Sequence, residues 1–195
     1  SSPVRVSIGG FDVYLADSMQ FYLEVGVRIT GKPVYYLMPS FRGEIADETH
    51  LPQFFHSEVE IDGGLNDIIE TAESYLRALV ASIRSRCAES LNNVAAGVVH
   101  LDDFLSQPTY RRLTFNEAVN LVPSQVILHD GWRSISRAGE AELLRIIGGP
   151  LWITHFDHLA VPFYQGFSDT THRQATNADF LLGSGEVIGA GERHT

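Results

Sequence analysis

Cysteine is nearly absent from the sequence, since Cys87 is the only one among 195 residues. A single cysteine excludes a disulfide framework within the chain and any metal site built from several cysteines. No apolar run approaches the roughly 20 residues that a membrane-spanning helix needs, and the N-terminus lacks the basic-then-apolar layout of a signal peptide. These absences predict a soluble, cytoplasmic chain without a membrane partner. The first residue is not methionine, and both ends look cut.

Basic residues are also few, because 14 Lys and Arg stand against 24 Asp and Glu and leave a net charge of -10. Such a chain has no general electrostatic attraction to a phosphate backbone, so nucleic acid is a less favoured partner. A small anion such as ATP remains possible, because a few well-placed arginines matter more for it than total charge.

Several catalytic signatures are missing as well: the sequence has no GxSxG motif, no Walker-type loop and no Rossmann fingerprint. His155, Asp157 and His158 could suggest a metal site, but they lack the i, i+4 spacing of a helical zinc pair and a further clear ligand. Cys87 stands in a helical pattern with no evident base, which argues against nucleophilic chemistry. Neither zinc nor cysteine chemistry is therefore favoured.

What the sequence does contain is enough apolar material for a sizeable core, 44% of its residues. No repeat, low-complexity tract or linker divides it, so residues 1–195 are expected to form one domain. Apolar residues recur at helical spacing from Leu65 to about Cys87, which predicts an amphipathic helix that covers a sheet. A capping box of Thr114 and Glu117 predicts a short helix, and another is expected after residue 139.

Extended segments alternate with these helices. Residues 11–24 are expected to start as a strand and to become helical near Ser18, a candidate N-cap. Strands are also expected in residues 150–165, and in 178–193 around a glycine-rich turn. The mixture predicts an α+β fold with an antiparallel sheet.

Residues 34–44 and 53–62 are predicted to form one long antiparallel hairpin, in which alternate residues share a face. One face is unusually polar and carries Ser40, Arg42, Glu44, Phe54, His56, Glu58 and Glu60. The opposite face of the second strand carries Phe55, Ser57, Val59 and Ile61, and is expected to pack on a core. The polar face is either a solvated surface or the floor of a ligand site, and the pattern alone leaves both open.

The hairpin segment, VYYLMPSFRGEIADETHLPQFFHSEVEI, resembles motif 2 of class II aminoacyl-tRNA synthetases, in which an FRxE strand, a loop ending in His and a strand with alternating acids form the ATP site. ADSMQFYLE, PLWITHFDHLAVPFYQ and ADFLLGSGEVIGAGER resemble three further segments of asparaginyl-tRNA synthetases. The four segments follow the right order across residues 11–193. The resemblance implies the class II fold, an antiparallel sheet flanked by helices, and a homodimer. Nothing in the chain resembles motif 1, motif 3 or the anticodon-binding domain.

For ATP, the resemblance assigns Arg42 to the α-phosphate, where a guanidinium can hold the negative charge that builds as a carboxylate attacks. It places Glu44 and His50 around the adenine-ribose and the terminal phosphates, and Phe54 against adenine. Arg42 and Glu44 are thus the expected catalytic residues. A core phenylalanine and an ordinary loop histidine stay open as alternatives, and Gln53 stands where the family usually has Glu.

For magnesium, Asp179 and Glu186 match the two acids that hold the ion against the ATP phosphates, and hard carboxylate oxygens suit Mg²⁺. Without the resemblance, both would be interpreted as solvated turn residues. Gly189 and Gly191 would then let the backbone approach the substrate closely, as glycines in any tight turn can.

For the amino acid, the resemblance puts Gln20 and Glu58 around the α-amino group and Arg193 near the side-chain oxygen of an Asp- or Asn-like molecule. Gln20 could instead be a helix-surface amide, and Glu58 a solvated acid. Leu23 stands where aspartyl-specific relatives usually have Lys, which argues for a neutral or altered substrate side chain. The chain also departs from the family at Thr49, Val161 and Glu192, where Arg, a cation and Gln are usual.

The main hypothesis is a free-standing ligase that uses ATP and Mg²⁺ to activate an Asp- or Asn-like amino acid as an acyl-adenylate. It would then transfer the acyl group to ammonia, an amine or another small acceptor, because the net charge and the missing anticodon domain make tRNA less favoured. One alternative is the catalytic portion of a true asparaginyl-tRNA synthetase. The other is a paralogue that binds ATP or a partner without turnover.

Overall fold

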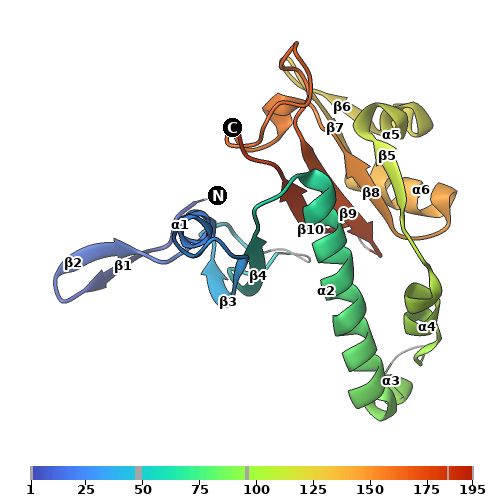
Figure 1. Ribbon diagram of the computed structural model, residues 1–195, viewed down its shortest axis with the longest axis horizontal. Helices are drawn as coiled ribbons and strands as arrows, with labels where there is room; N and C mark the ends of the chain where they lie inside the picture. Colours follow the sequence, from blue (N-terminus) through green and yellow to red (C-terminus); the bar gives the residue numbers. More distant parts are fainter. Residues whose placement is uncertain (1, 47–49, 95–96, 184, 195) are drawn as a thin grey trace. The chain divides into compact units, whose positions relative to one another are not determined.

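The computed structural model describes residues 2–46, 50–94, 97–183 and 185–194. The chain divides into two compact units, Ser1–Gly63 and Gly64–Thr195, drawn from blue to blue-green and from green to red in Figure 1. In the described part of the chain, no helix is both long enough and apolar enough to cross a membrane. The interpretation of residues 1–195 as one domain stays a prediction.

The first unit begins with a hairpin of β1 (Arg5–Ile8) and β2 (Phe11–Tyr14). Helix α1 (Gln20–Thr30) follows, so the predicted change from strand to helix within residues 11–24 is confirmed. The N-cap prediction is wrong by one residue, because Met19 holds that position. The Ser18 hydroxyl still accepts a hydrogen bond from the Gln20 backbone N–H, at 3.1 Å.

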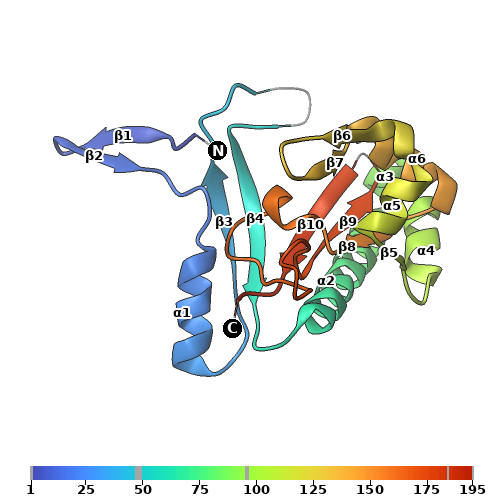
Figure 2. The same ribbon diagram turned by 90° about the horizontal axis from the view of Figure 1, so that it is seen from above.

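Strands β3 (Val34–Phe41) and β4 (Gln53–Glu60) form the predicted antiparallel hairpin. Its register sets Ser40 opposite Phe54. Helix α1 lies alongside this strand pair (Figure 2). Arg42 comes directly after the last residue of β3, so its side chain lies where the hairpin opens into the connecting segment.

The expectation that Phe55 faces a core is wrong. Phe55 is 66% exposed, and Tyr35 on the same face is 80% exposed. Helix α1 covers the other face, where Gly26 lets Val34 approach closely: a Cβ at residue 26 would lie 3.2 Å from Cγ2 of Val34. The helix thus packs on the face that the strand pattern marked as polar, a tertiary choice that alternation within one strand does not reveal.

The second unit contains the long predicted helix, α2 (Leu65–Arg86). Thr114 and Glu117 form the predicted capping box: the Thr114 hydroxyl accepts from the Glu117 backbone N–H at 3.2 Å, and the Glu117 carboxylate accepts from the Thr114 backbone N–H at 2.7 Å. The remaining helices are α3 (Ala88–Val94), α4 (Val99–Ser106), α5 (Phe115–Leu121) and α6 (Arg137–Ile147), with short 3₁₀ turns η1 (Pro123–Gln125) and η2 (His158–Ala160).

The main sheet of this unit has four strands in the order β10-β9-β8-β5. They are β5 (Arg111–Thr114), β8 (Leu151–Thr154), β9 (Asn177–Leu182) and β10 (Gly185–Gly191). Strands β8, β9 and β10 pair antiparallel, as predicted, whereas β5 and β8 pair in parallel. A separate hairpin, β6 (Val126–Leu128) and β7 (Arg133–Ile135), lies between α5 and α6 in the chain.

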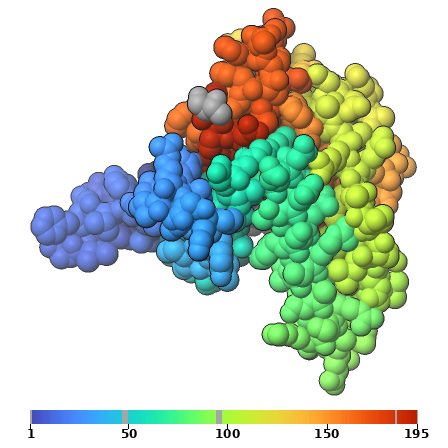
Figure 3. Space-filling view, in the orientation of Figure 1, coloured from blue at the N-terminus to red at the C-terminus, as the bar shows by residue number. Residues whose placement is uncertain are grey.

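The sheet buries both faces, because successive strand residues point to opposite sides. Trp152 and Phe180 pack on α2 and α4, in a cluster that also contains Ile69 and Phe104. Leu151, Ile153 and Leu181 point the other way, into a cluster with residues of α5 and α6. Figure 3 shows the green surface of α2 beside the yellow-green residues that follow it.

Candidate functional site

Arg42 in the first unit is held between an acid and an aromatic ring. Its Nε donates a hydrogen bond to Asp17 Oδ1 at 3.1 Å, and the centre of its guanidinium lies 5.1 Å from the centroid of the Phe54 ring. The Arg42 backbone N–H donates to the Pro52 carbonyl at 2.9 Å, next to the start of β4. The Phe41 backbone N–H donates to the Ala16 carbonyl at 2.9 Å, which holds the segment of Asp17 against the end of β3. The structure therefore brings together two of the residues predicted to bind ATP, and adds Asp17.

A buried hydroxyl and a histidine adjoin this group. Ser40 is only 2% exposed, and its Oγ lies 2.8 Å from Nδ1 of His56. The His56 ring meets Phe54 edge to face at 4.6 Å. Burial lowers the pKa of His56, and the nearby positive charge of Arg42 lowers it further, so the neutral ring is favoured at pH 7. A neutral His56 leaves Arg42 as the cation of this cluster.

Glu58 and Gln20, predicted to hold an α-amino group, are linked through one hydroxyl. Ser18 Oγ donates toward the Glu58 carboxylate, at 3.2 and 3.1 Å from its two oxygens. The same oxygen accepts from the Gln20 backbone N–H at the start of α1. The hydroxyl thus ties the first turn of the helix to β4 and fixes where the Glu58 carboxylate stands.

Glu44 and His50 belong to the segment between β3 and β4. The Glu44 carboxylate accepts a hydrogen bond from the Ser2 backbone N–H at 2.9 Å, and this bond is the main reason why the pKa of Glu44 is lowered. His50 follows residues 47–49, and Thr49, one of the departures from the family pattern, lies outside the described residues. Their assignment to ATP stays a prediction.

Asp179 in the second unit belongs to a group of three acids. It lies on the face of β9 opposite Ala178 and Phe180, away from the α2 cluster. Burial raises the pKa of Asp179 well above its usual range, and the negative charges of Glu186 and Glu140 raise it further. Sequence reasoning missed Glu140, since it lies on a different element, α6.

Gly189 keeps this acidic group compact. It pairs with Asp179 across β9 and β10, and a Cβ at residue 189 would lie 3.0 Å from Glu186 Oε1 and 3.7 Å from Asp179 Oδ1. In the described residues, no group of three or more His, Cys, Asp or Glu side chains is arranged to hold a metal ion. Two carboxylates suit Mg²⁺ only if phosphates or water complete its shell, as is usual for magnesium bound with a nucleotide.

Arg193 ends the segment that follows β10. Its guanidinium lies 4.6 Å from the centroid of the Tyr164 ring, and its backbone forms a bridge with Gln165. Glu192, which replaces the usual Gln, accepts from the Leu65 backbone N–H at 3.2 Å. An anion at the N-terminus of α2 is favourable there, so this departure has a structural explanation.

The histidines considered for zinc have other partners. His155 Nδ1 lies 2.9 Å from Thr154 Oγ1, and His158 Nε2 lies 3.0 Å from the Gln165 carbonyl. Asp157 accepts hydrogen bonds from Arg133 through both of its carboxylate oxygens. These bonds leave each group with a role in packing the loops that follow β8.

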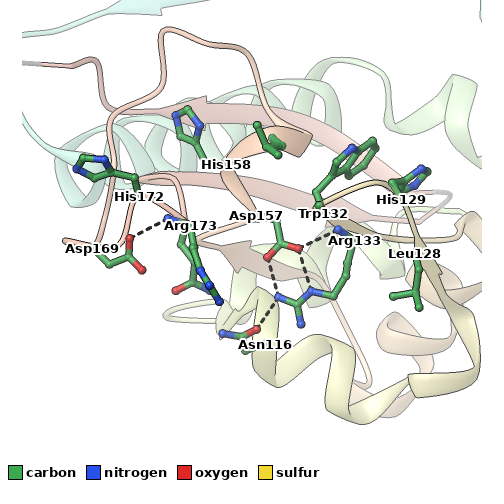
Figure 4. Close-up of a pocket in the computed structure, with 13 residues that line it drawn as sticks. Asn116, Leu128, His129, Trp132, Arg133, Asp157, His158, Asp169, His172 and Arg173 are labelled. Carbon is green, nitrogen blue, oxygen red and sulfur yellow. Dashed lines mark hydrogen bonds and ion pairs between the residues drawn. The ribbon is translucent and has the colours of Figure 1, made fainter.

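A pocket of about 870 Å³ opens between the β6–β7 hairpin and residues 169–174 (Figure 4). The ion pair of Arg133 and Asp157 crosses its floor, and Asn116 also accepts from Arg133. The ring of His129 stacks on Trp132 at 3.7 Å along one wall. None of the site residues predicted from the sequence is among the described residues that line this pocket.

Comparison with known proteins identifies the family. The family model described as tRNA synthetases class II (D, K and N) matches residues 3–195. The probable cytoplasmic asparagine–tRNA ligase of Encephalitozoon cuniculi is 29% identical over 99% of this chain and 45% of its own length. The asparagine–tRNA ligase of Chloroflexus aurantiacus is 27% identical over 92% of this chain and 42% of its own. The chain thus spans less than half the length of these relatives.

Solved structures show the same fold. The asparaginyl-tRNA synthetase of Pyrococcus horikoshii, complexed with asparaginyl-adenylate, superposes with a TM-score of 0.87 at 22% identity, covering 99% of this chain and 45% of that one. The aspartyl-tRNA synthetase of Entamoeba histolytica gives 0.75 at 20% identity, covering 92% and 38%. The fold that the resemblance implied is therefore confirmed, and the chain belongs to the class II tRNA synthetases of the D, K and N group.

Proposed function

We propose that this chain forms part of the catalytic domain of a ligase that activates asparagine with ATP. A carboxylate oxygen of the amino acid attacks the α-phosphorus, a new P–O bond forms, and the bond to the β-phosphate oxygen breaks. The products are asparaginyl-adenylate and pyrophosphate. No covalent enzyme intermediate is needed, so the protein has to align the two reactants and stabilise the developing charge.

The observation that carries this proposal is the placement of Arg42 against Phe54. A guanidinium held against one face of an aromatic ring can bind a phosphate oxygen while the other face of the ring stacks on a purine. Asp17 orients the guanidinium through Nε and leaves the two terminal nitrogens for the α-phosphate. Arg42 thereby stabilises negative charge on the non-bridging oxygens as the carboxylate attacks.

The amino-acid end of the proposal depends on Gln20, Glu58 and Arg193. Glu58 supplies a negative charge for an ammonium group, and the Ser18 hydroxyl keeps its carboxylate in place. Arg193 donates hydrogen bonds to the side-chain oxygen. Leu23, which is buried at 8% exposure, brings no second cation, and this favours the neutral side chain of asparagine over a carboxylate.

Asp179 and Glu186 are the residues proposed to bind magnesium. Burial raises the pKa of Asp179, and repulsion by the negative charges of Glu186 and Glu140 raises it further. A divalent cation would relieve that repulsion. When bound, Mg²⁺ would supply positive charge to the ATP phosphates. Glu44 and His50 are proposed to contact the nucleotide from the segment between β3 and β4.

For the acyl acceptor, tRNA is proposed instead of ammonia or an amine. The support is that both curated relatives described above are asparagine–tRNA ligases by name. A homodimer and a cytoplasmic location, which the family resemblance implies, are part of the same proposal. Sedimentation of the intact natural protein tests the homodimer.

Amino-acid-dependent exchange of pyrophosphate into ATP tests the first half-reaction without tRNA. Exchange is expected with asparagine, and Arg42→Ala should lower its kcat by roughly 100-fold or more, as for the loss of a donor that stabilises transition-state charge. Arg5→Ala is a matched control, because Arg5 forms an exposed ion pair with Asp12 in the β1–β2 hairpin, which carries none of the proposed site residues.

Three results would contradict the proposal in whole or in part. Equal exchange rates for Arg42→Ala and the natural protein would remove Arg42 from the catalytic role. Silence of the folded natural protein across the common amino acids would favour a paralogue without turnover. Active exchange with transfer to ammonia or an amine, but not to tRNA, would restore the small-acceptor hypothesis.

A further inference from the structure

Gln165 carries a buried polar group without a partner. The residue is 8% exposed, and its side-chain oxygen Oε1 forms no hydrogen bond within the described part of the chain. Buried side-chain oxygens are normally hydrogen-bonded, because leaving one unpaired forfeits the bonds it made with water. An orphaned acceptor in an otherwise well-packed unit therefore calls for a ligand or a structural reason.

The space around this amide depends on Gly191. A Cβ at residue 191 would lie 1.7 Å from Gln165 Oε1, so the glutamine amide rests directly on the glycine backbone. Any side chain at that position would push the amide away. The two residues therefore depend on each other, because Gln165 fills the space that the glycine leaves. The group that fills it is polar, although an apolar side chain of equal length would also fit.

Gln165 lies on the side of the sheet that carries the proposed substrate residues. Gly191 is two residues beyond Gly189 in β10, and both share a face with Asp179. Gln165 also forms a backbone bridge with Arg193, and directly opposed residues of an antiparallel bridge project to the same side. The orphaned acceptor thus belongs to the residue whose backbone pairs with the arginine proposed to bind the side-chain oxygen of the substrate.

We propose that Gln165 is a specificity-determining residue, whose Oε1 accepts a hydrogen bond from the carboxamide N–H of asparagine while Arg193 donates to the carboxamide oxygen. This assignment rests on the proposed function. A carboxamide has one acceptor and one donor end, and the two residues match both. The terminal torsion of glutamine is soft, so the amide can turn its oxygen from Gly191 toward the ligand without moving the rest of the side chain.

Aspartate would be selected against by the same pair. Its side chain has no N–H, so the buried oxygen of Gln165 would stay unpaired and would face a carboxylate oxygen. A site built to bond a donor rejects the analogue that lacks it more strongly than a hydrophobic pocket rejects a size difference. Gln165 is therefore expected to act on the choice between asparagine and aspartate more than on the rate of adenylation.

The test is pyrophosphate exchange by the intact natural protein and its Gln165→Met variant, with asparagine and aspartate as separate substrates. Gln165→Met keeps the length of the side chain and removes its polar end. It should raise KM for asparagine by roughly 10- to 100-fold, leave kcat within about 3-fold, and narrow the preference for asparagine over aspartate.

Gln174→Met is the matched control. Gln174 is a second glutamine of the same unit, and its Nε2 donates to the His155 carbonyl at 3.3 Å, so its loss should leave the asparagine preference unchanged. Gly191→Ala should narrow the preference for asparagine by a second route, because the new Cβ displaces the Gln165 amide while residue 165 stays glutamine.

The possible outcomes separate this inference from the proposed function. No exchange by the folded natural protein would overturn the proposed function and this inference with it. Exchange by the natural protein, with an unchanged KM and preference in Gln165→Met, would overturn the role of Gln165 alone. An equal loss of the asparagine preference in Gln165→Met and Gln174→Met would also overturn the role of Gln165, because the effect would then come from general packing.

Discussion

The two units bury their apolar side chains very differently. Among the described residues of Ser1–Gly63, Leu23 and Ser40 are the buried ones, while Phe11, Tyr22 and Tyr35 are 75%, 72% and 80% exposed. Gly64–Thr195 instead has two core clusters, one on each face of its main sheet. Burial of apolar surface is the dominant favourable term in folding, so the second unit carries its own stability and the first has little of its own.

The difference also applies to the proposed substrate-binding residues of each unit. Arg42, Phe54 and Glu58 belong to a hairpin with a single buried apolar neighbour, whereas Asp179 stands on a sheet packed on both faces. Gln165 lies outside that sheet and forms a backbone bridge with Arg193. Groups on the sheet are held by surrounding side chains. Groups on the hairpin depend on a few hydrogen bonds, such as those of Asp17 and Ser18.

Expression of the two units as separate chains should reveal the largest difference in stability between them. Residues 64–195 should fold alone and unfold cooperatively, because both core clusters lie within them. Residues 1–63 should show no cooperative thermal transition, because one buried apolar residue cannot offset the entropy of ordering the chain. Circular dichroism during heating measures both, and a cooperative transition for residues 1–63 would contradict this account.

Truncation of one residue in each unit should give the next largest contrast. Trp152 is fully buried and its Nε1 donates to Glu73 at 2.9 Å, so Trp152→Ala should cost about 3–5 kcal/mol of unfolding free energy. Tyr35→Ala, at an exposed position, should change it by less than about 0.5 kcal/mol. Urea titration measures both, and similar losses would remove the distinction between the units.

Removal of the capping box of α5 should cause a smaller loss of unfolding free energy. Thr114→Ala removes the hydroxyl that accepts from the Glu117 backbone N–H and should cost about 1 kcal/mol. Thr114→Ser keeps that hydroxyl and serves as the control. If both variants lost equal stability in urea, the methyl group and not the cap would be responsible.

The ionised carboxylate of Asp179, at the proposed magnesium site, should slightly lower the stability of the folded protein at neutral pH. The pKa of Asp179 is higher in the folded than in the unfolded chain, so the folded state binds more protons and stability falls as pH rises above about 4. Asp179→Asn should raise the melting temperature at pH 7, and the gain should vanish near pH 3.

Asp169→Asn is the matched control, and its expected change in stability at pH 7 has the opposite sign. A hydrogen bond from Thr171 is the main cause that lowers the pKa of Asp169, so this carboxylate adds stability above its unfolded pKa and loses it as pH falls. The variant should be less stable than the natural protein at pH 7. A gain at pH 7 for both variants would point to net charge instead of local environment.

Local patterns predicted much of this molecule. The stripe of α2, the capping box of Thr114 and Glu117, and the β3–β4 hairpin each follow from residues close in the chain. The four segments that resemble asparaginyl-tRNA synthetases identified the family, because their order and spacing are specific. The assignments of Arg42, Glu58, Asp179 and Arg193 to substrates stay predictions.

Features that depend on distant contacts could not be predicted. The exposed face of Phe55 follows from where α1 packs, and the parallel pairing of β5 with β8 joins strands far apart in sequence. Glu140 approaches Asp179 from another element, and the orphaned oxygen of Gln165 is defined by a glycine 26 residues later in the numbering. A signal for Gln165 did exist, since it directly follows the PFY tripeptide of a segment that resembles asparaginyl-tRNA synthetases.

Direct detection of the acyl-adenylate is the plainest test of the claim that the natural protein activates asparagine with ATP. The intact natural protein would be mixed with asparagine and ATP labelled at the α-phosphate, in a single turnover, first without tRNA and then with it. Asparaginyl-adenylate should accumulate without tRNA and decay when tRNA is added, as asparaginyl-tRNA appears. A folded protein that binds ATP but forms no adenylate with asparagine or aspartate would contradict the claim.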